Sequence, residues 1–125
     1  MSQLRKKILT VDDAGPVVVL CVNVLQALGH AVKGANHGEA ALDILRKESF
    51  DLLIVDYKMP GMNGFQVLAE ARDLHPDLRS ILVTGHGTPE ILKEADKMRF
   101  DAILLKPFTS SELRRTVEQV FVEKG

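Results

Sequence analysis

The sequence predicts an α/β protein of the doubly wound kind, and two observations support that class. Five short apolar runs are separated by stretches of helical length and period, so strands and helices alternate along the chain. Most of the runs are almost continuously apolar, which a parallel sheet covered by helices on both faces requires. We therefore expect five βα units with right-handed crossovers and with the active residues at the carboxyl edge of the sheet. The predicted strands are 8–11, 31–33, 52–55, 81–84 and 102–105, with 31–33 the weakest.

The segment after the first strand predicts a helix of unusual composition. It carries no charged residue between Asp13 and His30. Helical spacing places four of its apolar residues toward the sheet and three on the opposite side; these are Val17, Leu20, Val24 and Leu28, and Val18, Val19 and Val22. Valine disfavours helix, so an outer valine face is an unusual choice for a solvated surface. Docking of a partner, a homodimer contact and cover by another domain explain it equally well.

The other helices show ordinary start signals and core faces. A second helix begins near 36–38, and a third follows the third strand; their expected core faces are Ala40, Ala41, Ile44 and Leu45, and Val67, Leu68, Ala71 and Leu74. Thr88, Pro89 and Glu90 predict an N-cap, a proline at the first helical position and an acid in the first turn of the fourth helix. Thr109 and Glu112 have the spacing of a capping box before the fifth helix.

Length and composition favour one compact cytoplasmic domain over residues 1–125. The net charge is -1, from 16 basic and 17 acidic residues, so direct nucleic-acid binding is not expected. No run approaches the roughly 20 apolar residues that span a bilayer, so we expect no membrane insertion. The single cysteine, Cys21, excludes an internal disulfide and is expected to be a small packed hydrophobic residue.

Three carboxylates stand at the ends of two predicted strands. Asp12 and Asp13 follow the first strand, and Asp56 follows the third. Parallel strands bring such ends to one edge, and Mg²⁺ prefers a few hard oxygen ligands of this kind. A bound cation also explains why like charges are tolerated together. Taken singly, Asp13 and Asp56 are equally well explained as a helix cap and a turn cap.

Two further strand ends make the site interpretation stronger. Thr84 ends the fourth strand with a hydroxyl group, and Gly85 beside it leaves space for a bulky ligand. Lys106 follows the fifth strand as a point charge able to pair with a phosphoryl oxygen, and a cis Lys106–Pro107 bond would aim it inward. Asp56 is then the natural nucleophile, because a carboxylate can attack phosphorus to give an acyl phosphate.

These residues lie in motifs that resemble the receiver domains of two-component response regulators. The resemblance covers essentially the whole chain and rests on separated motifs in the right order, at 11–13, 53–64, 83–85 and 105–108. It implies a flavodoxin-like fold, with a five-stranded parallel sheet of order 2-1-3-4-5 and helices on both faces. It also implies a signalling module that catalyses its own phosphorylation and slow dephosphorylation, and is not otherwise an enzyme.

The resemblance assigns roles to the site residues by position. Asp56 matches the phosphoacceptor, Asp12 and Asp13 match the metal-binding acids, and Lys58 matches the residue whose backbone carbonyl completes a Mg²⁺ site. The phosphoryl donor in this family is a sensor histidine kinase or a histidine phosphotransfer protein.

Thr84 and Lys106 match the pair that holds the phosphoryl group. Their movement is expected to switch the surface of the fourth helix, fifth strand and fifth helix by a population shift. The sequence names no downstream effector or output domain, and a homodimer is possible.

Three positions bear on how such a switch works. Many receivers carry Tyr or Phe three residues before the lysine, where this chain has Ile103. We therefore expect switching to rely on the 84–88 loop and the fourth helix, so that Ile103→Ala leaves phosphorylation-dependent partner binding nearly intact. Lys58 and His86 flank the path of the hydrolytic water in this family, and an effect on acyl-phosphate lifetime or no kinetic effect is equally expected of them.

Two other functions compete with the phosphoacceptor. A Mg²⁺-dependent phosphohydrolase of similar build would need a second acid two residues beyond the nucleophile, where Lys58 stands. A scaffold that only binds partners typically lacks the acceptor or the acids, and this chain has them all.

Overall fold

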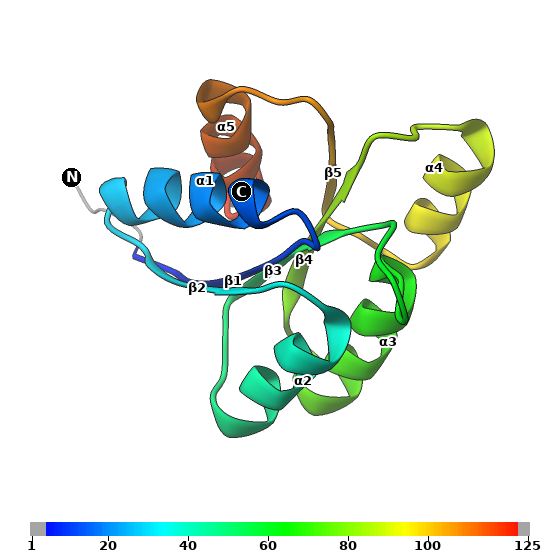
Figure 1. Ribbon diagram of the computed structural model, residues 1–125, viewed down its shortest axis with the longest axis horizontal. Coiled ribbons are helices and arrows are strands. Elements are labelled where there is room, and N and C mark those ends of the chain that lie inside the picture. The colour runs from blue at the N-terminus through cyan, green and yellow to red at the C-terminus, as the bar shows by residue number, and fades with distance from the viewer. Residues whose placement is uncertain (1–4, 123–125) are drawn as a thin grey trace.

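The chain folds into a five-stranded parallel sheet flanked by helices (Figure 1). The structure is a computed structural model and describes residues 5–122. Its strands are β1 (Lys7–Val11), β2 (Ala31–Ala35), β3 (Leu52–Asp56), β4 (Arg79–Thr84) and β5 (Ala102–Leu105). Its helices are α1 (Gly15–Ala27), α2 (Gly38–Lys47), α3 (Gly64–Leu74), α4 (Pro89–Lys97) and α5 (Ser110–Val120). All five predicted strands and the alternation of strands with helices are confirmed.

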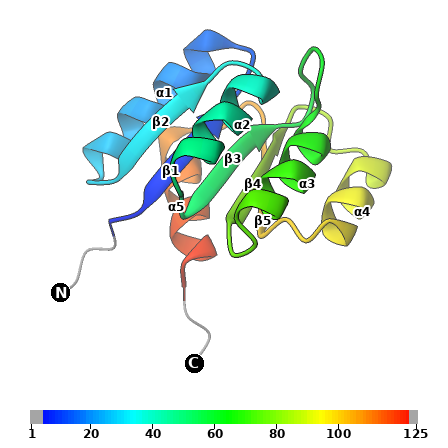
Figure 2. The same ribbon diagram turned by 90° about the horizontal axis from the view of Figure 1, so that it is seen from below.

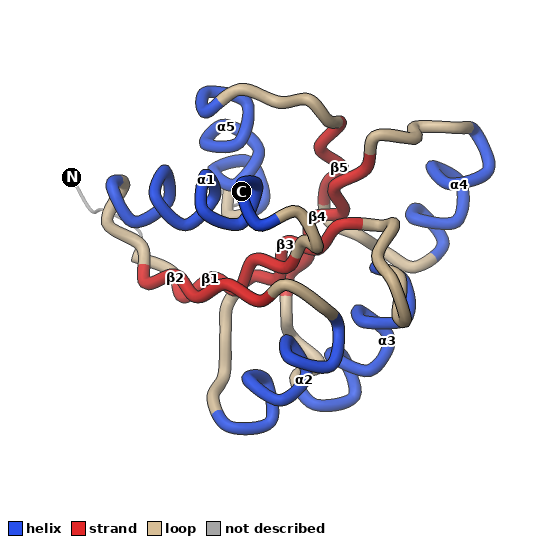
Figure 3. The backbone as a smooth tube through the Cα atoms, in the orientation of Figure 1, coloured by secondary structure: helices blue, strands red, loops and turns tan. Residues whose placement is uncertain are grey.

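The strand order is β2-β1-β3-β4-β5, as the resemblance implied. All four neighbouring pairs are parallel, and the ends of β1 and β3 lie in register because Val11 pairs with Val55. α1 and α5 cover one face and α2 and α3 the other, whereas α4 stands beyond α3, joined to β4 and β5 by loops (Figures 1, 2 and 3). The loops that follow the strands therefore meet at one edge of the sheet.

Two apolar cores hold the layers together, one on each face of the sheet. One core joins alternate residues of β1 and β3 to α2 and α3, and includes Leu9, Leu53, Leu42 and Leu68. The other joins the opposite residues of the strands to α1 and α5, and includes Ile8, Ile54, Leu25 and Leu113. Because successive strand residues face opposite sides, burial on both faces explains why the central strands are continuous apolar runs.

The predicted helix starts at α4 and α5 are confirmed. The Thr88 side chain accepts a hydrogen bond from the Ile91 amide at 3.3 Å. Thr109 and Glu112 form the expected capping box, in which each side chain accepts from the other residue's amide. A second capping box, between Asn63 and Gln66, starts α3 and was not predicted.

The predicted orientation of α1 is wrong in part. Its buried residues are Cys21 and Leu25, whereas Leu20 and Leu28 are 37% and 36% exposed. Val18 lies against β2, because a Cβ atom on Gly34 would come within 2.5 Å of its Cγ1. Apolar residues occur all round this helix, so their spacing could not fix which side faces the sheet.

The outer valine face is correspondingly smaller than expected, since Val18 and Val22 are half-buried and Val19 is 58% exposed. Leu74 of α3 is also 40% exposed instead of buried. Cys21 is buried, as expected. Within residues 5–122, no helix combines the length and apolar character that crossing a bilayer requires.

Candidate functional site

The three predicted acids meet at the carboxyl edge of the sheet. Asp12 follows β1, Asp56 is the last residue of β3, and Asp13 begins the loop to α1. Carboxylate oxygens from the three residues lie within 4.8 Å of one another. Asp12 and Asp56 are only 2% and 5% exposed, whereas Asp13 is exposed to solvent. The cluster therefore has a buried pair of acids and one acid at its mouth.

Lys106, the residue after β5, contacts two of these acids. Its Nζ atom lies 2.8 Å from Asp12 Oδ2 and 3.2 Å from Asp56 Oδ1. Its backbone amide donates to the Thr84 carbonyl at 2.9 Å, which extends the β4–β5 pairing to the lysine. The Lys106–Pro107 peptide bond is cis. One ammonium group thus bridges the two buried carboxylates.

The electrostatics of the site follow from burial and from this bridge. Burial raises the pKa of the Asp56 carboxyl group, the negative charge of Asp12 raises it further, and the contact with Lys106 only partly offsets the two. Burial alone would lower the pKa of Lys106, but the hydrogen bond and charge of Asp12, followed by those of Asp56, raise it overall. Lys106 is therefore held in its charged form, while ionised Asp56 lies in an environment that disfavours its charge.

Thr84 ends β4 with a buried side chain at the same edge. Its Oγ1 atom accepts a hydrogen bond from the His86 amide at 2.9 Å, which fixes the first turn of the loop to α4. The hydroxyl proton remains free to be donated to another acceptor, because a threonine hydroxyl both donates and accepts. Gly85 and His86 are exposed beside it.

The loop after β3 brings the backbone close to Asp56. Lys58 is exposed in this loop, two residues beyond Asp56. The Gly64 amide donates to the Tyr57 carbonyl at 2.9 Å, and a Cβ atom on Gly64 would lie 2.7 Å from the Asp56 carbonyl oxygen. Only glycine fits this position without a shift of the backbone. No role was predicted for Gly64, although it ends the 53–64 motif and stands directly at a helix start.

The donor set suits a hard divalent cation. Carboxylate oxygens from Asp12, Asp13 and Asp56 converge within the span of one coordination sphere, and such oxygens are the ligands that Mg²⁺ selects. No thiol or imidazole ligand belongs to this group. The residues present therefore fit Mg²⁺ better than Zn²⁺.

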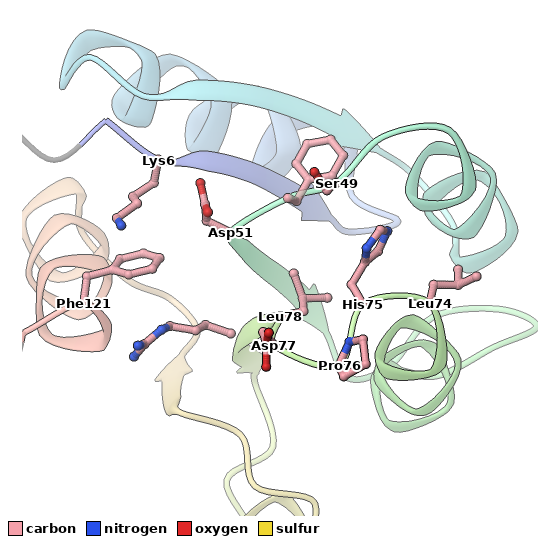
Figure 4. Close-up of a pocket in the computed structure, with 11 residues that line it drawn as sticks. Lys6, Ser49, Asp51, Leu74, His75, Pro76, Asp77, Leu78 and Phe121 are labelled. Carbon is pink, nitrogen blue, oxygen red and sulfur yellow. The ribbon is translucent and has the colours of Figure 1, made fainter.

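Two pockets lie at opposite edges of the sheet. An apolar pocket of about 440 Å³ lies beside Lys106, between α1 and the loop to α5, and is lined by Val17, Leu20, Pro107 and Phe108. Another, of about 430 Å³, lies at the opposite edge of the sheet, where Lys6 and Arg79 approach the ring of Phe121 (Figure 4). The second pocket contains none of the site residues described above.

Known proteins share this sequence pattern and this fold. The profile of the response regulator receiver domain matches residues 8–118. Sporulation initiation phosphotransferase F of Bacillus subtilis is 32% identical over 116 residues, which cover 93% of this chain and 94% of that protein. The structure of chemotaxis protein CheY4 of Vibrio cholerae has a TM-score of 0.89 at 29% identity, covering 94% of this chain and all of that one. A BeF3-activated receiver domain of DrrB has a TM-score of 0.85 at 25% identity, covering 94% and 97% of the two chains.

Proposed function

Because this chain belongs to the response regulator receiver family of two-component systems, we propose that Asp56 accepts a phosphoryl group from a phosphohistidine and that the chain signals through the resulting change of shape. The observation that carries the proposal is the group of Asp12, Asp56 and Lys106 at the edge of the sheet. These three residues place a nucleophile, ligands for a cation and a positive charge next to one another. A sensor histidine kinase or a histidine phosphotransfer protein is the donor.

Asp56 acts as the nucleophile in this reaction. One of its carboxylate oxygens forms a bond to phosphorus while the bond from phosphorus to the donor histidine nitrogen breaks, and the bonding electrons go to the imidazole ring. Phosphoryl transfer passes through a loose transition state, so positioning and charge neutralisation matter more than covalent assistance. Lys106 is already within 3.2 Å of Asp56 and is placed to pair with a phosphoryl oxygen.

A divalent cation completes this arrangement. Asp12, Asp13 and Asp56 would hold Mg²⁺ with the backbone carbonyl of Lys58, and bound Mg²⁺ supplies charge neutralisation at the phosphoryl oxygens. The exposed position of Asp13 leaves one side of the cluster open to solvent and to the donor. The buried position of Asp12 keeps one carboxylate fixed beside the acceptor.

Thr84 couples acceptance to the rest of the molecule. Its hydroxyl proton is available for a phosphoryl oxygen, while its Oγ1 atom is held by the His86 amide. A hydrogen bond to the phosphoryl group would draw the 84–88 loop inward and favour one of two arrangements of the surface formed by α4, β5 and α5.

The donor docks beside Lys106. The apolar pocket between α1 and the start of α5 is adjacent to the site, and Leu20, which lines it, is 37% exposed. A homodimer contact or cover by another domain would use the same residues. Leu20→Arg distinguishes docking from dimerisation, because donor specificity and oligomeric state are measured separately. Loss of donor specificity supports docking, and a change in oligomeric state supports the dimer.

The two competing functions are less well supported by the site. The scaffold reading predicts a missing acceptor or missing acids, whereas Asp12, Asp13 and Asp56 are all present and close together. The phosphohydrolase reading predicts a second acid where Lys58 stands.

Intact mass after incubation with acetyl phosphate tests the proposal directly. The protein should gain one phosphoryl group in the presence of Mg²⁺, and neither the metal-free protein nor Asp56→Asn should gain it. Asp51→Asn, at the other end of β3, is the matched control and should be phosphorylated normally. If neither an adduct nor a beryllofluoride complex forms in folded protein, the phosphoacceptor proposal is wrong and the scaffold reading replaces it.

A further inference from the structure

Helix α4 is attached to the rest of the molecule mainly through its C-terminal half, although Ile91 in its first turn is half-buried. Ala95 is its one buried residue within Pro89–Lys97. The neighbouring helices, in contrast, bury several residues each against the sheet. Figures 1 and 3 show α4 standing apart from the layer of α2 and α3. Few packing contacts therefore fix its direction, and polar contacts at its ends decide how it is held.

The C-terminal end is fastened by an arginine from α3. The Arg72 guanidinium group donates from Nη1 to the Met98 carbonyl oxygen, and from Nη2 to the Arg99 carbonyl oxygen at 2.6 Å. These carbonyls lie just beyond the last turn of α4, where no intrahelical partner exists for them. The planar fork of arginine binds both at once, which a lysine cannot do.

The residues that follow are fixed to the core and to β4. The Phe100 ring lies 6.0 Å from the Phe65 ring and packs against the core beneath α3. The Asp101 amide donates to the Ser80 carbonyl at 2.9 Å, and Asp101 Oδ2 accepts from the Ser80 amide at 2.8 Å. Four successive residues, 98–101, are thus tied to α3 or β4.

The N-terminal end has a weaker attachment, in which only Ile91 of the first turn is half-buried. Residues 85–90 are all exposed, and the cap supplied by Thr88 belongs to the helix itself. Gly87 rests against Leu105, whose Cδ2 atom would lie 3.0 Å from a Cβ at position 87, and Leu105 is itself 53% exposed. This end follows directly from Thr84, the residue placed to respond to the phosphoryl group.

We propose that α4 pivots about a fixed C-terminal end, with Arg72 as the anchor, when the 84–88 loop moves. The pivot rests on the proposed function, because phosphorylation of Asp56 is what moves that loop. A helix fastened at one end and loose at the other responds by rotation of its free end, which is a small hinge motion. Arg72 is then a positioning residue for signal output and takes no part in the chemistry.

Amide hydrogen exchange measured by NMR tests the anchor before any phosphorylation. The amides of residues 92–94 and of 98–101 are all hydrogen-bonded, so their protection can be compared. We expect protection at 98–101 to exceed that at 92–94 by at least about tenfold, since hydrogen bonds from a charged donor shift local opening by such a factor. Arg72→Ala should lower protection at 98 and 99, and Arg72→Lys should lower it nearly as much. Protection at 100 and 101 should change less, because Phe100 packing and the Ser80 hydrogen bonds remain. Equal protection in the wild type, or no change in Arg72→Ala, would overturn the anchor.

A second measurement tests the pivot itself. After addition of acetyl phosphate and Mg²⁺, with the adduct verified by mass, protection in the wild type should change at 92–94 and stay unchanged at 98–101. In Arg72→Ala it should change at 92–94 and also at 98 and 99. Arg46→Ala, which removes only a surface ion pair with Asp43, is the matched control and should behave as the wild type. An equal change at both ends of α4 in the wild type would overturn the pivot.

The outcomes for the two proposals are distinguishable. Absence of an adduct would defeat the phosphoacceptor function and the trigger of the pivot, while the exchange pattern before phosphorylation would still decide the anchor. Thermal unfolding of Arg72→Ala and Arg72→Lys establishes that both are folded. An adduct that forms normally in both variants shows that Arg72 acts on output and not on phosphoryl transfer.

Discussion

The role proposed for Asp56 works against the stability of the protein. A nucleophile must be ionised, yet burial and the neighbouring Asp12 both raise its pKa and so disfavour the charged form. Lys106 offsets part of this by lying between the two carboxylates. Natural sites commonly hold groups in such unfavourable surroundings, because the same surroundings favour the reaction.

Asp56→Asn should therefore stabilise the metal-free protein at neutral pH, because it removes a charge that burial and Asp12 disfavour. A pKa raised in the folded state means that this residue's contribution to stability is fully present below its ordinary pKa and is lost as the pH rises through the folded value. The advantage of the variant should thus be largest near pH 7 and should shrink as the pH falls toward 4. Urea unfolding in the presence of a chelator, at several pH values, measures it.

The control for this experiment is Asp77→Asn, an exposed acid at the opposite edge of the sheet (Figure 4). It should leave the stability within a few tenths of a kcal/mol of the wild type at each pH, as surface substitutions usually do. A destabilised Asp56→Asn protein would mean that the ion pair with Lys106 outweighs the cost of burial.

At the scale of elements, α1 and α4 end with the same backbone motif. In α1, the Gly29 amide donates to the Gln26 carbonyl and the His30 amide to the Leu25 carbonyl. In α4, the Arg99 amide donates to Asp96 and the Phe100 amide to Ala95. Both are Schellman motifs, whose central residue takes the left-handed conformation. Gly29 has φ 97°, and Arg99 has φ 62°.

Arg99→Gly should therefore raise the free energy of unfolding, by up to about 1 kcal/mol, because glycine adopts this conformation without the steric cost that a Cβ atom incurs. The contacts of Arg72 should survive, since they are made with the backbone carbonyl of residue 99. The reciprocal change, Gly29→Ala, should lower stability by about 1 kcal/mol. Thermal unfolding of both variants measures these effects; a less stable Arg99→Gly would show that the arginine side chain contributes more than its conformation costs.

The helix ends and the helix faces differ in how far the sequence could predict them. Caps depend on a few residues of fixed chemistry, so Thr88 and the pair of Thr109 and Glu112 were placed correctly. The orientation of α1 depends on contrast between apolar and polar sides, and a helix that is apolar all round offers little contrast. The anchoring of α4 by Arg72 joins residues 26 positions apart in the sequence, and no local pattern marks that pairing.

At the scale of the whole molecule, the parallel sheet is what creates the site. The residues after β1 and β5, Asp12 and Lys106, lie 94 positions apart in the sequence, yet the strands bring them to one edge with those of β3 and β4. The pattern of apolar runs predicted the parallel sheet and hence this convergence. It could not predict strand order, which depends on pairings between distant segments, so that part came from family resemblance. The hydrogen bond from the His86 amide to the Thr84 hydroxyl could not be predicted either, because it depends on the backbone conformation of the loop.

The same edge should link metal binding to the stability of the entire fold. A cation that binds the folded chain and not the unfolded one stabilises it by about 2.7 kcal/mol at one hundred times its dissociation constant. We expect Mg²⁺ to raise the melting temperature in a concentration-dependent way, and Asp13→Asn to remove most of the rise. Asp13 is exposed, so its substitution should cost little stability in metal-free buffer, which separates a lost ligand from a damaged fold.

Differential scanning calorimetry across a Mg²⁺ series checks this expectation, with KCl at matched ionic strength to remove the general effect of screening. Asp77→Asn should keep the full rise, because it lies at the opposite edge from the cluster. If Asp13→Asn also kept the full rise, the cation would be bound elsewhere, and the assignment of the three acids as its ligands would be wrong. If KCl alone reproduced the rise, the acids would be responding to ionic strength, and only the closeness of Asp12 and Asp56 would be explained, by their pairing with Lys106.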